Sequence, residues 1–172
     1  MAKTLQELFV DMVNAKNPGL GMTVADVDFG TPSVYAPADE DDERNTALTL
    51  TAKTANDKFK GSKEYHYKRE NLTNPGDPGQ YTTLITDLIT NYDDDAFALQ
   101  QLNNNLYSPY KLAASDVTIT RSEQFDDGGK TAIDITFTVK PENLQYVGVH
   151  IIRIWNGKDN LQTKTAELDG FV

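Results

Sequence analysis

Carboxylates are grouped at three points of the sequence, and several carboxylate oxygens held at one point are what a calcium ion requires. The longest group is the acidic run Asp39–Glu43, and shorter groups occur at Asp93–Asp95 and Asp126–Asp127. None has the alternating D-x-D-x-D-G spacing that orients the ligands of a calcium loop. A helix cap explains the second group and a turn explains the third. A solvated, exposed loop is therefore the simpler interpretation of the longest run.

A site built from carboxylates remains the alternative to a purely structural protein. In this alternative the chain is a small enzyme or a ligand- or calcium-binding module. Its site is formed by Asp26, Asp28 and the acidic loop at residues 39–43. The observation that favours this alternative is a deep pocket in which these carboxylates converge.

Groups suited to nucleophilic or transition-metal chemistry are scarce. The two histidines, His66 and His150, lie in different expected strands, and neither has a second histidine at ligand spacing. The chain has no cysteine, no serine in a G-x-S-x-G turn and no glycine-rich phosphate loop. We therefore predict no catalytic residue, no metal and no cofactor, and we expect a protein that is not an enzyme.

Lysines and aromatic side chains are combined at residues 63–69 of an otherwise acidic chain. This basic patch could dock an acidic surface, such as the acidic loop of a neighbouring copy. The alternative is a solvated edge strand that its charges protect from further pairing. The candidate contact residues are Lys63, Tyr65, Tyr67, Lys68 and Arg69 in the patch, Asp39, Asp41 and Asp42 in the acidic loop, and Trp155 and Phe171 towards the C-terminal end.

Charge and hydropathy narrow the class of protein. The 172 residues carry a net charge of −10, which favours solubility and argues against nucleic acid as a direct partner. The first residues do not have the pattern of a secretory signal, and no apolar run approaches the roughly 20 residues of a membrane helix. We expect folding in a cytoplasm-like compartment and no membrane partner.

The clearest structural prediction is a β-hairpin at Thr131–Trp155. In its first limb Ile133, Ile135 and Phe137 alternate with polar residues, which indicates a strand with one dry face. Its return limb is apolar on both faces, as is typical of a central strand. Everything else in the chain must cover this hairpin.

Further elements follow from periodicity and from turn residues. Apolar residues at helical spacing predict helices over 4–16 and Tyr81–Tyr92 and a third helix that starts at Asp93–Asp95 and ends before Pro109. Alternating residues predict strands at Met22–Phe29, Asn45–Lys53, Glu64–Arg69 and Asp116–Arg121. The fold class is α+β, with a mainly antiparallel sheet covered by helices.

The two halves of the chain have corresponding features at an offset of 90 residues. Thr4 aligns with Asp94, and Leu8, Phe9 and Met12 align with Ala98, Leu99 and Leu102. Farther on, the stretch 45–50 aligns with 130–135. Two explanations stay open: a duplicated α-β-β-β unit, or chance similarity of a generic apolar pattern. The first predicts units at 1–72 and 73–155, with 156–172 as an extended C-terminal arm.

One part of the chain resembles a known class of protein. The run Asp26–Pro32, then Tyr35, residues 45–52 and residues 65–69 resemble a module in structural proteins of large tailed bacteriophages. The resemblance covers residues 24–72. It implies a virion component made in the bacterial cytoplasm, such as a head decoration, collar or tail accessory protein. It also implies that the partners are other virion proteins and copies of the chain itself, and it carries over no catalytic residue.

Overall fold

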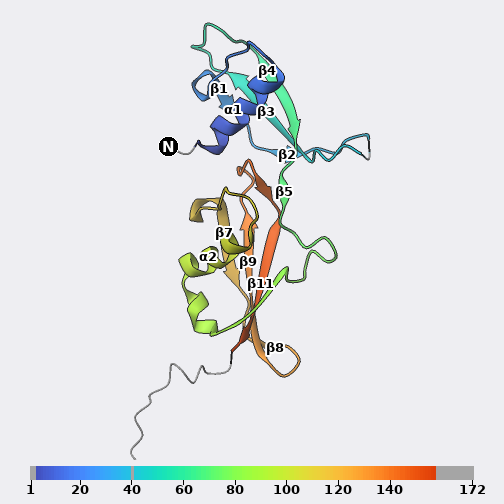
Figure 1. Cartoon of the computed structure of the whole chain (residues 1–172), viewed down its shortest axis with the longest axis vertical. Coiled ribbons are helices and arrows are strands. Elements are labelled where there is room, and N and C mark those ends of the chain that lie inside the picture. The colour runs from blue at the N-terminus through green and yellow to red at the C-terminus, as the bar shows by residue number, and fades with distance from the viewer. Residues whose placement is uncertain (1–2, 40, 158–172) are drawn as a thin grey trace, which may run out of the picture. The chain divides into compact units, whose positions relative to one another are not determined.

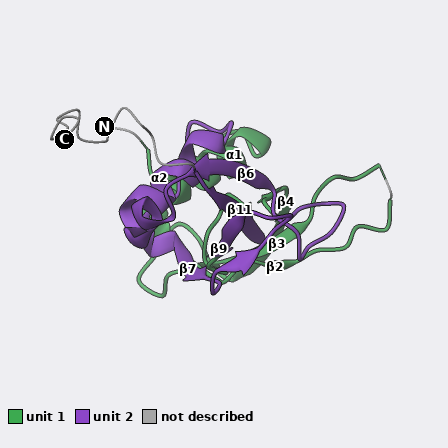
Figure 2. Cartoon of the chain, turned by 90° about the horizontal axis from the view of Figure 1, so that it is seen from below, with its two compact units in different colours: residues 1–72, 139–147 green, residues 73–138, 148–172 purple. Residues whose placement is uncertain are grey.

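The computed structural model describes residues 3–39 and 41–157 as two compact units (Figure 2). Unit 1 comprises residues 1–72 and 139–147, and unit 2 comprises residues 73–138 and 148–172. The sequence places residues 139–147 in the second half, whereas the chain returns to unit 1 there. The α+β class with mainly antiparallel pairing is confirmed. No helix within the described ranges is long and apolar enough to cross a membrane.

Unit 1 is a β-sheet with one helix packed on it (Figure 1). The central strand β3 pairs antiparallel with β4 along one edge and with β1 and β2 along the other. A separate parallel pair joins β5 to β10. The elements are α1 (Leu5–Lys16), the 3₁₀ helix η1 (Val24–Asp26), β1 (Val27–Phe29), β2 (Ser33–Val34), β3 (Thr46–Ala52), β4 (Ser62–Tyr67), β5 (Glu70–Asn71) and β10 (Tyr146–Val147).

Helix α1 begins and packs as its sequence predicts. The Glu7 N–H donates to Thr4 Oγ1, and the Thr4 N–H donates to the Glu7 carboxylate, which completes a capping box. The apolar side of the helix lies on the sheet and shields it from water. The buried core of unit 1 consists of Phe9, Val10, Val13, Met22, Val27, Leu48 and Leu50.

Unit 2 contains a sheet with the strand order β6-β11-β9-β7, and α2 lies beside β7 and β9 (Figure 1). Strand β6 runs parallel to β11, and the short strand β8 pairs antiparallel with β9. The elements are β6 (Thr83–Asp87), the 3₁₀ helix η2 (Ile89–Asp93), α2 (Asp95–Asn105), the 3₁₀ helix η3 (Ala114–Asp116), β7 (Val117–Arg121), β8 (Phe125–Asp126), β9 (Thr131–Val139) and β11 (Val149–Asn156).

The hairpin predicted at Thr131–Trp155 is confirmed. Strands β9 and β11 pair antiparallel, from Val149 opposite Thr138 to Trp155 opposite Ala132. Strand β11 is central, with β6 on one edge and β9 on the other. Its inward residues Ile152 and Ile154 are completely buried. The residues of its opposite face are half-buried, and that face carries the first candidate site.

The helix predicted at Tyr81–Tyr92 is wrong, because this segment forms strand β6 and then η2. The apolar spacing fits a helix, but β-branched residues make up most of Thr83–Thr86 and favour an extended backbone. Pairing with β11 decides between the two, because β6 supplies the second strand neighbour of β11 and makes β11 a central strand. The strand predicted at Met22–Phe29 is also shorter, since η1 precedes β1.

The two units share a helix-to-strand connection with the same hydrogen bonds. In unit 1 the side chain of Asn14 bonds both the N–H and the carbonyl of Met22, at 2.9 and 2.8 Å. In unit 2 Asn103 bonds Leu112 in the same two ways, at 2.9 and 2.8 Å. Each connection leads into a 3₁₀ helix and then a strand, η1–β1 and η3–β7.

The strand ladders repeat as well. Strand β2 pairs Ser33 with Ala47 on β3, and β8 pairs Phe125 with Ala132 on β9. Ala47 in unit 1 thus corresponds to Ala132 in unit 2. The sequence alignment of 45–50 with 130–135 gives the same correspondence. The helices align differently from the expectation, because the buried residues of α1 are Phe9, Val10 and Val13 and those of α2 are Ala98, Leu99 and Leu102. The helical match is therefore shifted by one residue.

Candidate interaction surface

The outer face of the unit 2 sheet carries a connected set of charged and aromatic side chains. Asp134 on β9 lies opposite Arg153 on β11, and Ala132 lies opposite Trp155. The alternating residues Ile133 and Ile154 are buried on the other face, so these polar side chains point away from it. We call the set the Trp155 cluster; it consists of Tyr81, Phe125, Asp127, Lys130, Asp134, Arg153 and Trp155.

Arg153 is the centre of this cluster. Its Nε and Nη2 donate to the two oxygens of Asp134 at 2.8 and 2.9 Å, and its Nη1 donates to Asp127 at 3.1 Å. The rings of Tyr81 and Phe125 lie 4.5 and 4.9 Å from the guanidinium carbon. A bidentate pair that is also held by rings fixes the orientation of the guanidinium.

The indole of Trp155 is held in the same way. Its Nε1 donates to Asp127 Oδ2 at 2.7 Å, and the ammonium of Lys130 lies 3.5 Å from the ring centroid. The bonds from Trp155 and Arg153 lower the pKa of Asp127. The bonds to Asp134 raise the pKa of Arg153. Two cations and two carboxylates are thus arranged in one balanced network beside a half-buried indole.

Unit 1 has a contact at the corresponding positions. The rings of Tyr35 and His66 are stacked, with centroids 3.8 Å apart and planes at 14°. His66 Nε2 lies 2.8 Å from Glu64 Oε1. The other histidine, His150, belongs to unit 2, is buried, and its Nε2 lies 3.0 Å from Thr83 Oγ1. Both histidines therefore have local structural partners.

The basic patch at residues 63–69 is divided between the surface and the interior. Lys63 and Lys68 are exposed, as a surface strand requires. Tyr65 and Tyr67 instead pack edge to face on Phe9 of α1, with centroids 6.3 and 4.9 Å apart. The strand β4 is at the edge of its sheet as expected, but its two tyrosines form part of the core beneath α1.

Arg69 is not a surface residue, and its assignment as a contact residue is corrected. Only 4% of it is exposed. Its guanidinium donates to Thr46 Oγ1 at 2.9 Å and to the carbonyls of Asn143 and Pro141 at 3.0 and 3.4 Å. Arg69 therefore ties the segment 139–147 to the rest of unit 1.

Two carboxylates of the acidic loop are paired with cations of the same chain. Asp42 Oδ1 accepts from Arg44 Nε at 2.7 Å, and Glu43 accepts from Lys68 Nζ at 2.9 Å. Asp39 Oδ1 accepts from the backbone N–H of Asp41 at 3.0 Å. The basic strand and the acidic loop, for which a contact between copies was one of two interpretations, are joined within one copy by the pair Lys68–Glu43.

The carboxylates of the alternative site do not converge. Asp26 accepts bonds from the N–H and hydroxyl of Thr23 and from the amide of Asn56, at 2.8, 2.7 and 2.7 Å. These bonds lower the pKa of Asp26, those from Thr23 most strongly. Asp28 lies on β1 and is exposed. Within residues 3–39 and 41–157, no group of three acidic or histidine side chains is placed to hold a metal ion.

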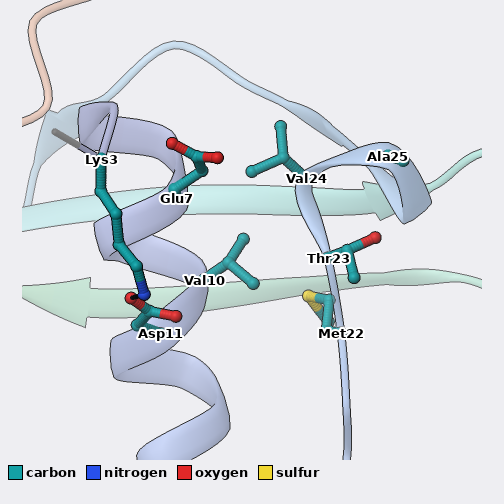
Figure 3. Close-up of a pocket in the computed structure, with 8 residues that line it drawn as sticks. All are labelled: Lys3, Glu7, Val10, Asp11, Met22, Thr23, Val24 and Ala25. Carbon is teal, nitrogen blue, oxygen red and sulfur yellow. Dashed lines mark hydrogen bonds and ion pairs between the residues drawn. The ribbon is translucent and has the colours of Figure 1, made fainter. Parts of the chain in front are cut away.

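A shallow pocket of about 350 Å³ lies between α1 and the segment that leads into η1 (Figure 3). Val10, Met22 and Val24 form its apolar wall. The charged side chains on its helix side are already paired, because Lys3 contacts Asp11 and the Glu7 carboxylate caps the helix. We assign no ligand to this pocket.

Two exposed tyrosines were not among the predicted contact residues. Tyr107 is fully exposed and Tyr110 is 38% exposed, in the loop that follows α2. The sequence signal is a pair of tyrosines that flank Ser108-Pro109 just beyond the helix. Phe171 and the arm residues 158–172 lie outside the described residues.

No curated protein and no solved structure matches this chain. A family model matches residues 1–171, which is nearly the whole sequence. The chain therefore belongs to DUF7941, a family of unknown function.

Proposed function

We propose that the protein is a non-enzymatic structural component of a tailed-phage virion that acts through repeated protein–protein contacts. The observation that carries the proposal is the Trp155 cluster on the outer face of the unit 2 sheet. Tryptophan, tyrosine and arginine are the residues that most often dominate the binding energy of protein interfaces.

The geometry of the cluster suits a contact surface. The side chains of Arg153 and Trp155 are already fixed by hydrogen bonds, so a partner that binds them orders little that was mobile. Lys130 and Arg153 balance Asp127 and Asp134 locally, although the chain as a whole carries a charge of −10. A balanced patch can approach another acidic copy with less repulsion than the rest of the surface.

The virion part of the proposal rests on the sequence of unit 1. The segment 24–72 resembles a module of phage structural proteins, and its resemblance motifs fall on β1, β3 and β4. Under this proposal the chain is made in the bacterial cytoplasm and its partners are other virion proteins and copies of itself. Assembly as a decoration, collar or tail accessory protein is the finer form of the proposal.

The test is the native particle. An affinity tag is placed on the chain in its source genome, and intact particles are purified and examined by quantitative mass spectrometry and electron microscopy. We expect a copy number set by particle symmetry and a protein neighbour on the Trp155 cluster. Absence of the chain from purified particles overturns the proposal.

The role of the cluster is tested with surface variants. Lys130→Glu reverses the charge that lies over the indole and leaves both partners of the Asp127–Trp155 bond in place, and Trp155→Ala removes the indole. Both are expected to reduce incorporation into particles by at least tenfold. Thr118→Ala, an exposed change on β7 outside the cluster, is the matched control. Normal incorporation of both cluster variants, with melting temperatures that prove folding, removes the cluster from the interface.

A further inference from the structure

Strand β6 leaves an open edge on the unit 2 sheet. In the strand order β6-β11-β9-β7 its one strand neighbour within the described residues is β11. An edge strand presents unpaired backbone groups, and proteins commonly protect it with charges, proline or a bulge. The edge strand of unit 1, β4, has this protection, because Lys63 and Glu64 lie on it and Lys68 follows it.

In β6 the one charged residue is Asp87, at the end of the strand. The five residues Thr82–Thr86 are all uncharged, in a chain whose net charge is −10. Leu84 in the middle of this stretch is 38% exposed, although it is a large apolar residue. The segment is thus a place where two copies can meet without bringing like charges together.

The ladder with β11 shows which backbone groups face outward. The Gly157 N–H donates to the Asp87 carbonyl at 2.8 Å, so the backbone of Asp87, the last residue of β6, points towards β11. Because alternate residues of a strand point to opposite neighbours, Thr83 and Ile85 also point towards β11, and the N–H and carbonyl groups of Leu84 and Thr86 point to the open edge. These groups are the donors and acceptors available to an added strand.

We propose that the occupant of this edge is β6 of a second copy, paired antiparallel about a two-fold axis with Leu84 opposite Leu84. The two Leu84 residues then exchange both backbone hydrogen bonds, and Thr83 of each copy lies opposite Ile85 of the other. Residues opposite each other in an antiparallel ladder point to the same face. The outer faces of the two sheets are therefore on the same side, and the contact is isologous.

Every pair in this register is chemically matched. The two Leu84 side chains form an apolar pair at a hydrogen-bonded position of the ladder. Thr83 faces Ile85, and Thr82 faces Thr86, so the flanking pairs are β-branched residues suited to a sheet. Asp87, the first charged residue, lies outside the five matched positions, and its carboxylate already accepts from the Leu88 N–H.

This pairing deepens the proposed function, because it supplies one of the copy-to-copy contacts, but it depends only on the geometry of β6. The two proposals fail separately. A chain that dimerises through β6 and is absent from particles keeps the pairing and loses the virion role. A chain that is present in particles but monomeric in solution at all concentrations loses the pairing.

The test is sedimentation equilibrium of the full chain and of charge variants at one position. We expect a concentration-dependent dimer for the wild type and loss of the dimer for Leu84→Lys and for Leu84→Asp, because each variant sets two like charges opposite each other. An equimolar mixture of the two variants is expected to restore a dimer, since lysine then faces aspartate. Thr118→Lys on the other edge strand, β7, is the control and should dimerise like the wild type.

Each other outcome overturns the proposal. If the wild type is monomeric, no second copy binds the β6 edge. If both single variants still form dimers, the dimer contact lies elsewhere. A mixture that stays monomeric rejects the Leu84–Leu84 register. Circular dichroism melting verifies that the variants fold, which is expected because the Leu84 side chain is exposed.

Discussion

The indole Nε1 of Trp155, which lies on the central strand β11, donates to the Asp127 carboxylate at 2.7 Å. Asp127 lies in the turn that joins β8 to β9. The residue that follows β2 in unit 1, Tyr35, stacks on His66 at the corresponding place. The repeated framework thus brings the same two positions together but fills them with different chemistry. The pair in unit 2 joins an indole to a carboxylate, and it forms part of the proposed contact surface.

Replacing Asp127 with asparagine is expected to change the acid stability of unit 2. The bonds from Trp155 and Arg153 lower the pKa of Asp127, so its ionised form stabilises the folded state above the ordinary aspartate pKa near 3.9. That contribution is lost as the pH falls through about 4 and then through the lowered pKa.

The measurement is denaturant unfolding of the wild type and Asp127→Asn, followed by Trp155 fluorescence between neutral pH and pH about 3. The variant should be less stable at neutral pH, and the gap should close on acidification. Asp126→Asn is the control, because the neighbouring Asp126 carboxylate only accepts a turn bond from Gly129. A gap that is constant with pH would contradict the assigned role of the charge.

The asparagines that connect helix to strand are expected to be stability determinants of each unit. Asn103→Ala leaves the N–H and the carbonyl of the buried Leu112 without their partner and should cost about 1–3 kcal/mol. Asn14→Ala should do the same in unit 1, where Met22 is the partner. Asn104→Ala, on the exposed side of α2, is the control. Hydrogen exchange measures the stability of each unit separately. Equal exchange in Asn103→Ala and Asn104→Ala would contradict the role assigned to Asn103.

The sequence predicted the elements whose residue pattern fits only one type of secondary structure. It missed an element whose type depends on the strand that it pairs with. Alternation over nine residues identified β9, and a capping box identified the start of α1. Leu84 and Ile85 fit either a helix or a strand, and only the open edge of β11 decides for the strand. Trp155 was a predicted contact residue, but its partner Asp127 seemed explained by a turn. A contact between residues 28 positions apart has no local signal.

Arg69 shows the same limit and gives a third prediction. Arg69→Ala removes the donor to the Asn143 and Pro141 carbonyls, and we expect a loss of about 1–3 kcal/mol in the stability of unit 1. The adjacent Lys68→Ala breaks only the exposed pair with Glu43 and should cost less than about 1 kcal/mol. Hydrogen exchange at Glu70, whose N–H donates to the Gln145 carbonyl, measures release of the segment 139–147. Equal effects of the two variants would place Arg69 at the surface after all.

Tyr67 is expected to titrate late and to tolerate loss of its hydroxyl. Burial raises its pKa to about 12, and burial together with the nearby Asp87 raises that of Tyr92 to about 12. Because these folded-state pKa values exceed the ordinary value near 10, the stability they contribute is complete below pH about 10 and is lost as the pH rises towards 12. Among the described residues the Tyr67 hydroxyl has no hydrogen-bond partner. Tyr67→Phe should therefore keep or raise the stability at neutral pH, by up to about 1 kcal/mol, since it removes a buried polar group without a protein partner.

Alkaline difference absorbance at the tyrosinate band measures the ionisation of the tyrosines. Tyr67→Phe and Tyr92→Phe should each remove one late-titrating tyrosine. Stability curves between pH 9 and 12 should fall less steeply for Tyr67→Phe than for the wild type. A wild type in which all tyrosines ionise together near pH 10 would mean that β4 does not hold its tyrosines beneath α1. That result would return Tyr67 to the surface, and with it the basic patch that the sequence predicted.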